Sequence, residues 1–387
     1  MSKSDESQAE RGRHRQPVVL VSANSAWNLV HFRSALLAAL AAEGYWIVAA
    51  APDDGHSSAL AERGFSFEPL AMSRSGMNPF ADAWLFLRYL RLMRKVRPAV
   101  YLGYTIKPNI YGSIAARLAG AERINTVTGL GTSFIDRPRL TRLALSLYRA
   151  ALRGSLRVFF QNRDDLNLFR RSGTVTEQQS RLVPGSGIDL SKFDVHAQAD
   201  AAPLTFLFIG RLLRDKGIRE YFEAARLLRR ERPGARFQIL GDLDLANRTA
   251  VSSAELDSWI AEGSVEHLGY AKDVRPSIAA ATAVVLPSYR EGMPRTLLEA
   301  GAMGKPLVAT DVPGCREIVE EGVTGTLCRA RDAQSLAAAM DRVASMSVEQ
   351  RRALGQAARR RVEERFSEEQ VIGAYLEAMR DARVSRK

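Results

Sequence analysis

Two glutamates, Glu291 and Glu299, have seven residues between them and flank the expected start of a helix. The strand pattern AVVLPS ends shortly before them, Gly292 permits a turn, and Pro294 stands where a helix would begin. Glu291 then lies in the loop and Glu299 about a turn and a half inside the helix, so both carboxylates can face one site. Carboxylates accept hydrogen bonds from sugar hydroxyls, and the amides of Gly292 and Met293 at a helix N-terminus suit a phosphate.

Two cations, Arg211 and Lys216, lie five positions apart in the run GRLLRDKG, which follows the strand pattern LTFLFIG. Cationic side chains beside the free N–H groups of a helix N-terminus form a site for phosphate. Taken alone, such a loop is as well explained by solvated surface charge. Tyr270 follows the strand pattern VEHLG and is placed to hold a nucleobase.

Neither a metal nor a cofactor is expected. The run Asp242-Leu243-Asp244 has DxD spacing, but so short a match occurs by chance, and the five histidines show no ligand spacing. The first expected strand is followed by SANSAWN, which has no glycine, and the chain contains neither GxxxxGKS nor GxxxxGKT. These observations exclude a dinucleotide-binding fingerprint and a P-loop.

Short β-branched runs alternate with helical patterns twice along the chain. PVVLVSA, YWIVAAA and AVYLGY are each followed by a helical stretch, and LTFLFIG, FQILGD and PLVAT repeat the pattern. The alternation predicts an α/β fold of two Rossmann-like, doubly wound parallel-sheet domains, with ligands bound in a cleft beyond the carboxyl ends of the strands. We expect a loose tail over 1–16, domains over 17–195 and 203–365, and a C-terminal helix over 366–387 that packs back on the first domain.

Composition narrows the class of protein. The 387 residues are 46% hydrophobic and 25% charged, which excludes wholesale disorder, collagen and coiled coil. Two cysteines exclude a disulfide scaffold and fit a reducing compartment. The net charge of +12 favours an anionic partner, and residues 1–200 hold most of it, with 26 basic against 17 acidic side chains.

Two basic stretches, 79–98 and 137–157, carry much of that surplus. The first contains an apolar stripe at helical spacing flanked by arginines: Trp84, Leu87, Leu90 and Met93 with Arg88, Arg91 and Arg94. The pattern is typical of a helix at a membrane interface, and equally of an amphipathic helix packed on its own domain.

The spacing of Arg211 and Lys216 and the E-x7-E of Glu291 and Glu299 resemble the donor half of the retaining glycosyltransferases of family four (glycosyl transferases group 1), which have the B-type two-domain fold. VPGSGID resembles the interdomain turn, and LEAGAMGKPLVATDVPGCREIV resembles the stretch after the E-x7-E, so the similarity covers nearly the whole chain. Segments 22–36, 104–112 and 125–131 resemble the branch that elongates undecaprenyl-diphosphate-linked glycans of capsule, O-antigen or N-glycan type.

The resemblance implies metal-independent transfer of a hexose or N-acetylhexosamine, with retention, from a UDP-sugar to a polyprenyl-diphosphate-linked saccharide. Arg211 and Lys216 would clamp the donor diphosphate, because negative charge grows on the leaving phosphate, which itself draws the acceptor proton. Glu291 would hold the donor sugar hydroxyls and Glu299 the ribose hydroxyls. The remaining donor-binding residues would be Gly292, Met293, Pro294 and Tyr270.

The acceptor diphosphate would bind polar residues at strand ends or loops of the first domain: Asn24, Arg33, Lys107 and Asn109. Many family members place a histidine near the fifth strand of that domain, where this chain reads TVTG, so His31 is the candidate substitute. The basic stretches suit anionic lipid, and we expect a cytoplasmic enzyme, peripheral on the inner face of the cell membrane.

Two alternatives stay open. A nucleotide-sugar epimerase has a similar two-domain fold and would need neither an acceptor nor a lipid-facing helix. A nucleic-acid binder would use the +12 charge, but the chain lacks helix-turn-helix, zinc-knuckle and RNP-like signatures. We therefore expect no nucleic-acid partner.

Overall fold

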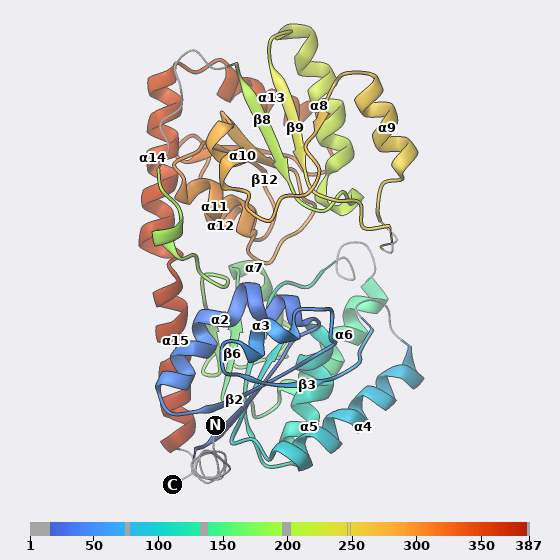
Figure 1. Cartoon of the computed structure of the whole chain (residues 1–387), viewed down its shortest axis with the longest axis vertical. Helices are drawn as coiled ribbons and strands as arrows, with labels where there is room; N and C mark the ends of the chain where they lie inside the picture. Colours follow the sequence, from blue (N-terminus) through green and yellow to red (C-terminus); the bar gives the residue numbers. More distant parts are fainter. Residues whose placement is uncertain are drawn as a thin grey trace. The chain divides into compact units, whose positions relative to one another are not determined.

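The computed structural model describes residues 16–73, 78–131, 138–195, 203–245, 247 and 249–384. They divide into two compact units (Figure 1). The described parts of unit 1 are residues 16–73, 78–130, 138–186 and 368–384, and the described parts of unit 2 are residue 131 and the described residues of 187–367. The N-terminal part of unit 1 therefore ends at Ser186, whereas the first domain was expected to reach 195. The expected tail, except Gln16, and residues 196–202 between the two expected domains lie outside the described residues.

Unit 1 is built on a sheet of seven parallel strands in the order β3-β2-β1-β4-β5-β6-β7. Val19 of β1 lies beside Ile47 of β2 on one side and Val100 of β4 on the other, where the strand order reverses. The strands are β1 (Val18–Ser22), β2 (Trp46–Ala51), β3 (Ser66–Pro69), β4 (Val100–Tyr104), β5 (Glu122–Val127), β6 (Arg157–Phe160) and β7 (Ser180–Leu182). The helices are α2 (Ala26–Ala42), α3 (Ser57–Ala61), α4 (Pro79–Val96), the π-helical turn η1 (Pro108–Gly112), α5 (Ser113–Leu118), α6 (Pro138–Leu152), α7 (Arg163–Arg171) and α15 (Glu368–Val384).

Helices cover both faces of this sheet because its strands are apolar on both sides. Val19 and Val21 of β1 join a core with α2, α3 and α15, whereas Leu20 between them joins a second core with α4 and α5. Successive side chains of a strand point to opposite faces, so a run such as VVLVS serves two cores at once.

Unit 2 repeats the plan with six parallel strands in the order β10-β9-β8-β11-β12-β13. Phe206 and Phe208 of β8 face α8, α9 and α13, whereas Leu207 and Ile209 face α11 and α14. The strands are β8 (Thr205–Ile209), β9 (Arg236–Leu240), β10 (Glu266–His267), β11 (Ala283–Leu286), β12 (Leu307–Thr310) and β13 (Gly325–Cys328). The helices are η3 (Leu190–Lys192), η4 (Arg214–Lys216), α8 (Ile218–Glu231), α9 (Ser253–Ala261), α10 (Arg275–Ala280), α11 (Arg295–Ala302), α12 (Cys315–Ile318), α13 (Ala333–Ala344) and α14 (Val348–Arg365). The expected pair of doubly wound parallel sheets is thus confirmed.

The last helix, α15, belongs to unit 1 and runs beside α2 (Figure 1). Tyr375 is fully buried in the core of unit 1, with its ring 4.7 Å from that of Phe159. Two polar contacts add to the apolar ones: Arg157 donates to Asp381 (2.8 Å), and Arg383 donates to the hydroxyl of Tyr45 (2.6 Å). The helix is therefore an integral part of the first unit's core.

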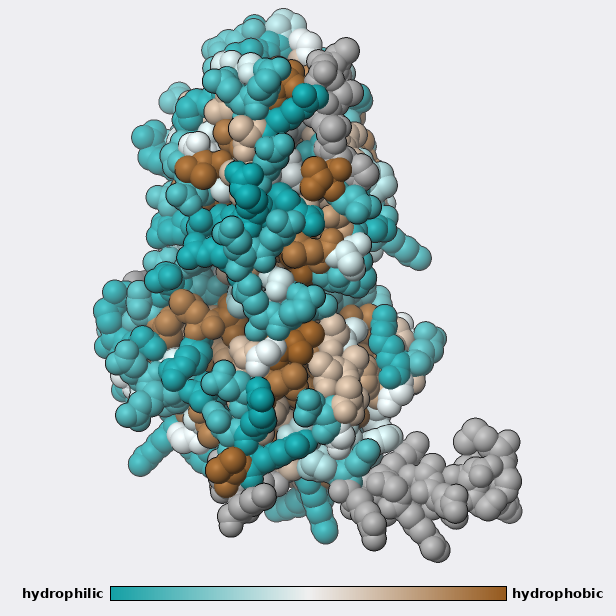
Figure 2. Space-filling view, turned by 90° about the vertical axis from the view of Figure 1, so that its left-hand side faces the viewer, coloured by the Kyte–Doolittle hydropathy of each residue, from teal (hydrophilic) through white to brown (hydrophobic). Residues whose placement is uncertain are grey.

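The surface drawn in Figure 2 is mainly hydrophilic, and its hydrophobic residues form small separate groups. Within the described residues, no helix combines the length and the apolar character that crossing a membrane requires.

Candidate functional site

Three loops meet at the carboxyl ends of β8, β9 and β10 in unit 2. The amide of Gly210 donates to Leu240 (3.0 Å), and the amide of Gly241 donates to Gly269 (2.8 Å). Nε2 of His267 donates to the carbonyl of Gly241 (2.8 Å). A side chain at Gly241 would lie 1.9 Å from the Gly210 carbonyl oxygen, so glycine is required where the loops approach most closely. These contacts set the course of the backbone on which Arg211 and Tyr270 stand.

Two of the predicted site residues, Lys216 and Glu291, lie together at this end of the sheet. Nζ of Lys216 lies 2.5 Å from Oε1 of Glu291, and the same oxygen accepts a hydrogen bond from Ser288 Oγ at 2.7 Å. The side chain of Glu291 is largely buried and that of Lys216 is about one quarter exposed. The carboxylate is therefore held by two donors in a partly desolvated place, where charge-assisted hydrogen bonds are strong.

The backbone locks the two loops that carry this pair. The amide of Tyr289 donates to the carbonyl of Asp215 (3.0 Å). Gly217 has φ +73°, and a Cβ there would lie 2.0 Å from the carbonyl oxygen of Pro287. Only glycine fits this close approach, so the residue after Lys216 fixes the distance between the cationic loop and the acidic one.

The helix α11 begins where the sequence predicts, with Pro294 as its N-cap residue. Glu299 lies inside the helix, and its Oε1 accepts a hydrogen bond from Nε of Arg295, one turn earlier, at 2.7 Å. Burial raises the pKa of Glu299, and the Arg295 guanidinium opposes that effect. Gly292 and Met293 lead into the helix N-terminus, where the helix dipole favours an anion.

Arg211 and Asp244 form an ion pair, with Nη1 of the arginine 2.9 Å from Oδ2 of the aspartate. Both side chains reach solvent. Asp244 is the second acid of the DxD run, and this contact assigns it a partner within the chain. Among the described residues, no group of three or more histidine, cysteine, aspartate or glutamate side chains is arranged to hold a metal ion.

Several contributors to the site were not predicted from the sequence. Tyr289 donates to Glu220 of α8 (2.7 Å), and the guanidinium of Arg331 lies 4.8 Å from the Tyr289 ring centre. Burial, and after it the hydrogen bond with Glu220, raise the pKa of Tyr289 above its usual range. Arg331 follows β13 and has a left-handed backbone conformation, with φ +60°. No sequence motif indicates its contact with Tyr289. Tyr270, which was predicted from the sequence, lies in the loop after β10 and is 63% exposed.

The predicted acceptor residues of unit 1 lie in different surroundings. Asn24 is half-buried just after β1. Arg33 is buried, with its guanidinium 4.3 Å from the centre of the Tyr104 ring. Asn109 is fully buried and donates to the carbonyl of Thr126 (2.8 Å) while accepting from Asn125 (2.9 Å). Arg33 and Asn109 are therefore engaged in the interior of unit 1.

Lys107 lines a cavity of about 330 Å³ beside α4. Its Nζ lies 2.8 Å from Oδ1 of Asp82, and both side chains are nearly buried. Trp84 and Arg88 line the same cavity. Of the four predicted acceptor residues, Lys107 is the one that lines this cavity.

The exposed side of α4 differs from the prediction. The expected stripe does not form a single face: Trp84 and Leu87 are exposed, Leu90 is partly buried and Met93 is buried. The helix instead buries Leu85, Tyr89 and Leu92 together with Met93. A strict spacing of three drifts around a helix of 3.6 residues per turn, whereas steps of four and three stay on one face. Phe80 (83%), Trp84 (54%) and Leu87 (41%) are consequently exposed beside Arg91 and Arg94.

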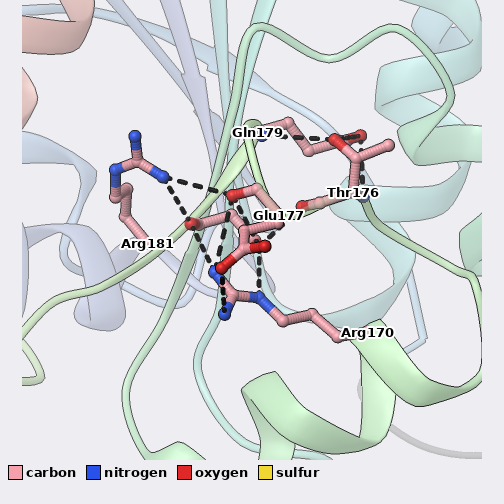
Figure 3. Close-up of polar contacts among 6 residues, drawn as sticks. Arg170, Thr176, Glu177, Gln179 and Arg181 are labelled. Carbon is pink, nitrogen blue, oxygen red and sulfur yellow. Dashed lines mark hydrogen bonds and ion pairs between the residues drawn. The ribbon is translucent and has the colours of Figure 1, made fainter.

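A second cavity, of about 320 Å³, lies between α7 and the edge strand β7. Two arginines that line this cavity form hydrogen bonds within the chain (Figure 3). Arg170 donates to Ser180 Oγ (2.9 Å). Arg181 donates to the carbonyls of Ser180 (3.1 Å) and Glu177 (3.2 Å). The Arg170 contact ties the edge strand to α7, whereas the Arg181 contacts stay within the strand and the loop before it.

Two family models match the chain. The model described as Glycosyl transferases group 1 matches residues 203–346, and the model described as Glycosyl transferase 4-like matches residues 18–162. They match the second and the first unit respectively.

Two curated relatives align over most of their own length. The N,N'-diacetylbacillosaminyl-diphospho-undecaprenol alpha-1,3-N-acetylgalactosaminyltransferase of Campylobacter jejuni is 27% identical over 80% of this chain and 84% of its own. The UDP-Gal:alpha-D-GlcNAc-diphosphoundecaprenol alpha-1,3-galactosyltransferase of Escherichia coli is 26% identical over 65% of this chain and 68% of its own.

Solved structures share the fold over the full length. Sucrose-phosphate synthase from Thermosynechococcus elongatus superposes with a TM-score of 0.78 at 21% identity, covering 96% of this chain and 100% of that one. The Anabaena protein HepE, solved in complex with UDP, gives 0.76 at 18% identity, covering 95% and 100%. The chain therefore belongs to the glycosyl transferases of group 1 and is a glycosyltransferase of the B-type fold.

Proposed function

We propose that this glycosyltransferase moves a hexose or N-acetylhexosamine, with retention, from a UDP-sugar to a saccharide joined through diphosphate to a polyprenyl lipid, in the synthesis of a cell-surface glycan. The observation that carries the proposal is the Lys216–Glu291–Ser288 group beside the N-terminus of α11. The names of the Campylobacter and Escherichia coli relatives support the acceptor class, since both specify a sugar-diphosphate-undecaprenol.

The arrangement suits loss of a diphosphate leaving group. Negative charge grows on the phosphate in the transition state, and a cation with amides at a helix N-terminus stabilises it most when both are fixed beforehand. In our proposal Lys216 supplies that cation while it also orients Glu291 toward the donor sugar hydroxyls. Glu299 binds the ribose hydroxyls, and the leaving phosphate takes the acceptor proton.

We also propose that transfer requires no metal. Asp244 supports this proposal because its carboxylate is paired with Arg211. Activity that survives EDTA and does not rise with added Mg²⁺ or Mn²⁺ is the expected result. Loss in EDTA with recovery on adding Mn²⁺ would contradict it.

The test of the main proposal is a panel of UDP-sugars with a polyprenyl-diphosphate-linked N-acetylglucosamine as the acceptor. One donor should yield an extended lipid-linked product. NMR of this product should show an axial glycosidic bond when the anomeric bond of the UDP-sugar is axial, which is the result expected for retention. Lys216→Ala and Glu291→Ala should each lower the rate at least a hundredfold, in the range found when one transition-state contact is removed. Full activity in either variant, or an epimerised UDP-sugar without an acceptor, would overturn the assignment.

We further propose that α4 rests on the inner face of the cell membrane. Phe80, Trp84 and Leu87 supply exposed apolar surface beside arginines, and each basic residue near anionic lipid contributes about 1 kcal/mol. Changing Arg88, Arg91 and Arg94 to glutamate should release the protein from phosphatidylglycerol vesicles.

The matched control for the membrane experiment is an equal charge reversal on unit 2, at Arg230, Arg352 and Arg360. It alters the net charge by the same amount, so it separates an effect of charge on α4 from an effect of the net charge of the whole protein. Equal release by both triple variants, or unchanged pelleting of the α4 variant, would contradict a role for α4.

A further inference from the structure

A group of aromatic and histidine side chains lies at the carboxyl edge of the sheet in unit 1. Trp27 stands in the first turn of α2, directly after β1, and its backbone amide donates to Asp54 in the loop after β2 (3.2 Å). Ligands of open parallel sheets bind at this edge, beyond the strand ends. Trp27 is 39% exposed there.

The exposed indole is held firmly in place. Its ring stacks on His31 at 4.6 Å with an interplanar angle of 25°, and meets Phe32 edge-on at 5.1 Å. His31 in turn contacts the ring of His56 edge-on at 5.7 Å. Three rings from α2 and one from the loop before α3 thus form one continuous aromatic group, the Trp27 platform.

Hydrogen bonds within the chain fix the two imidazoles. Nδ1 of His31 donates to the carbonyl of Trp27 (2.9 Å), and Nδ1 of His56 lies 3.2 Å from Oδ1 of Asp54. Because these partners accept hydrogen bonds, each Nδ1 carries a proton. The rings therefore cannot turn freely, and the platform is organised before any ligand binds.

We propose that the Trp27 platform binds a sugar ring of the acceptor by stacking. This inference rests on the proposed function, and it names the part of the acceptor that unit 1 recognises. A pyranose has an apolar face of C–H groups and a rim of hydroxyls, which matches the exposed part of the flat Trp27 indole with the polar imidazoles beside it. Because the rings are already fixed, binding orders few side chains. His31 is thereby a positioning residue for the acceptor.

The test compares two probes by calorimetry with the full chain. One is a short-chain prenyl diphosphate carrying N-acetylglucosamine, and the other is the same prenyl diphosphate without sugar. Trp27→Leu should weaken binding of the sugar-bearing probe about tenfold and leave the sugarless probe unchanged, whereas Trp27→Phe should keep most of the affinity. Leu118→Ala, an exposed apolar residue of α5, is the matched control and should change neither.

Other outcomes decide against the proposal. Equal loss for both probes would indicate a lipid or phosphate contact, and wild-type affinity in Trp27→Leu would show that the indole contacts no ligand. A wild-type chain that binds both probes equally would also overturn it. UDP binding is measured in parallel: its absence from the wild type would refute the proposed function, whereas intact UDP binding with failure of the sugar test refutes only this inference.

Discussion

Replacing Gly217 by alanine tests whether close backbone packing positions the loop that carries Lys216, the cation of the proposed site. Gly217 lies between Lys216 and the start of α8, with φ +73°. Gly263, after α9, has nearly the same φ, +75°, and a Cβ there would have no atom of the described residues within 4 Å apart from those of its chain neighbours. Gly263→Ala is therefore a matched control for the conformational effect alone.

The expected size of the effect follows from one distance. Both alanines meet the left-handed backbone penalty of about 1–2 kcal/mol. At position 217 the new Cβ would also lie 2.0 Å from the carbonyl oxygen of Pro287, whereas ordinary contact begins at 3.4 Å. The loop must therefore retreat by roughly 1.4 Å, and a misplacement of about 1 Å can lower a rate about a hundredfold.

The assay is the initial rate of sugar transfer, with the melting temperature measured on the same samples. We expect both variants to melt a few degrees lower, and only Gly217→Ala to lose about two orders of magnitude in rate. If its rate stays within threefold of that of Gly263→Ala, the approach to Pro287 does not position Lys216, and the reasoning fails.

Three further predictions concern the interior of the units. Tyr375→Ala should lower the free energy of unfolding by about 3–5 kcal/mol, measured by urea titration, because a fully buried aromatic side chain is lost. Asn109→Ala should destabilise unit 1 by about 1–3 kcal/mol with the KM for the acceptor unchanged, since the Asn125 amide loses one of its two acceptors and the buried Thr126 carbonyl loses the Asn109 donor; a raised KM would support an acceptor role. Burial lowers the pKa of Lys305 from 10.5 to about 8, so the folded state binds fewer protons between these values and stability should rise there with pH. The free energy of unfolding should rise by about 3 kcal/mol across this range. Denaturant titrations of the Lys305→Met variant at pH 7 to 10 should show no such rise.

Much of the fold could be predicted from sequence because its signals are local. The central strands of both sheets are buried on two faces, so they read as continuous apolar runs, and the helices between them have their own periodicity. The α4 stripe was mispredicted because two apolar faces compete on one helix, and the choice between them depends on the Leu20 and Tyr101 side chains it covers. Local periodicity contains no information about that distant partner.

The candidate site likewise has parts that could be predicted from the sequence and parts that could not. The meeting of Lys216 with Glu291 follows from motifs at the ends of neighbouring parallel strands, β8 and β11. The burial of Asn109 could not be predicted, because it depends on contacts with Asn125 and Thr126 of another strand. The Arg331–Tyr289 contact joins two loops with no shared pattern. The spacing of residues in a motif does not reveal contacts between side chains that lie far apart in the sequence.

The return of the chain to unit 1 at α15 has a consequence for biosynthesis. On the ribosome, residues 187–367 emerge before Glu368–Val384, so the second unit can close its core while the first still lacks Tyr375 and its neighbours. Until then the groove between α2 and Phe159 stays open, with apolar surface available to a chaperone or to another nascent chain. The unit that is translated first is therefore the one that matures last, and premature termination after α14 would release a chain whose defect lies in its N-terminal half.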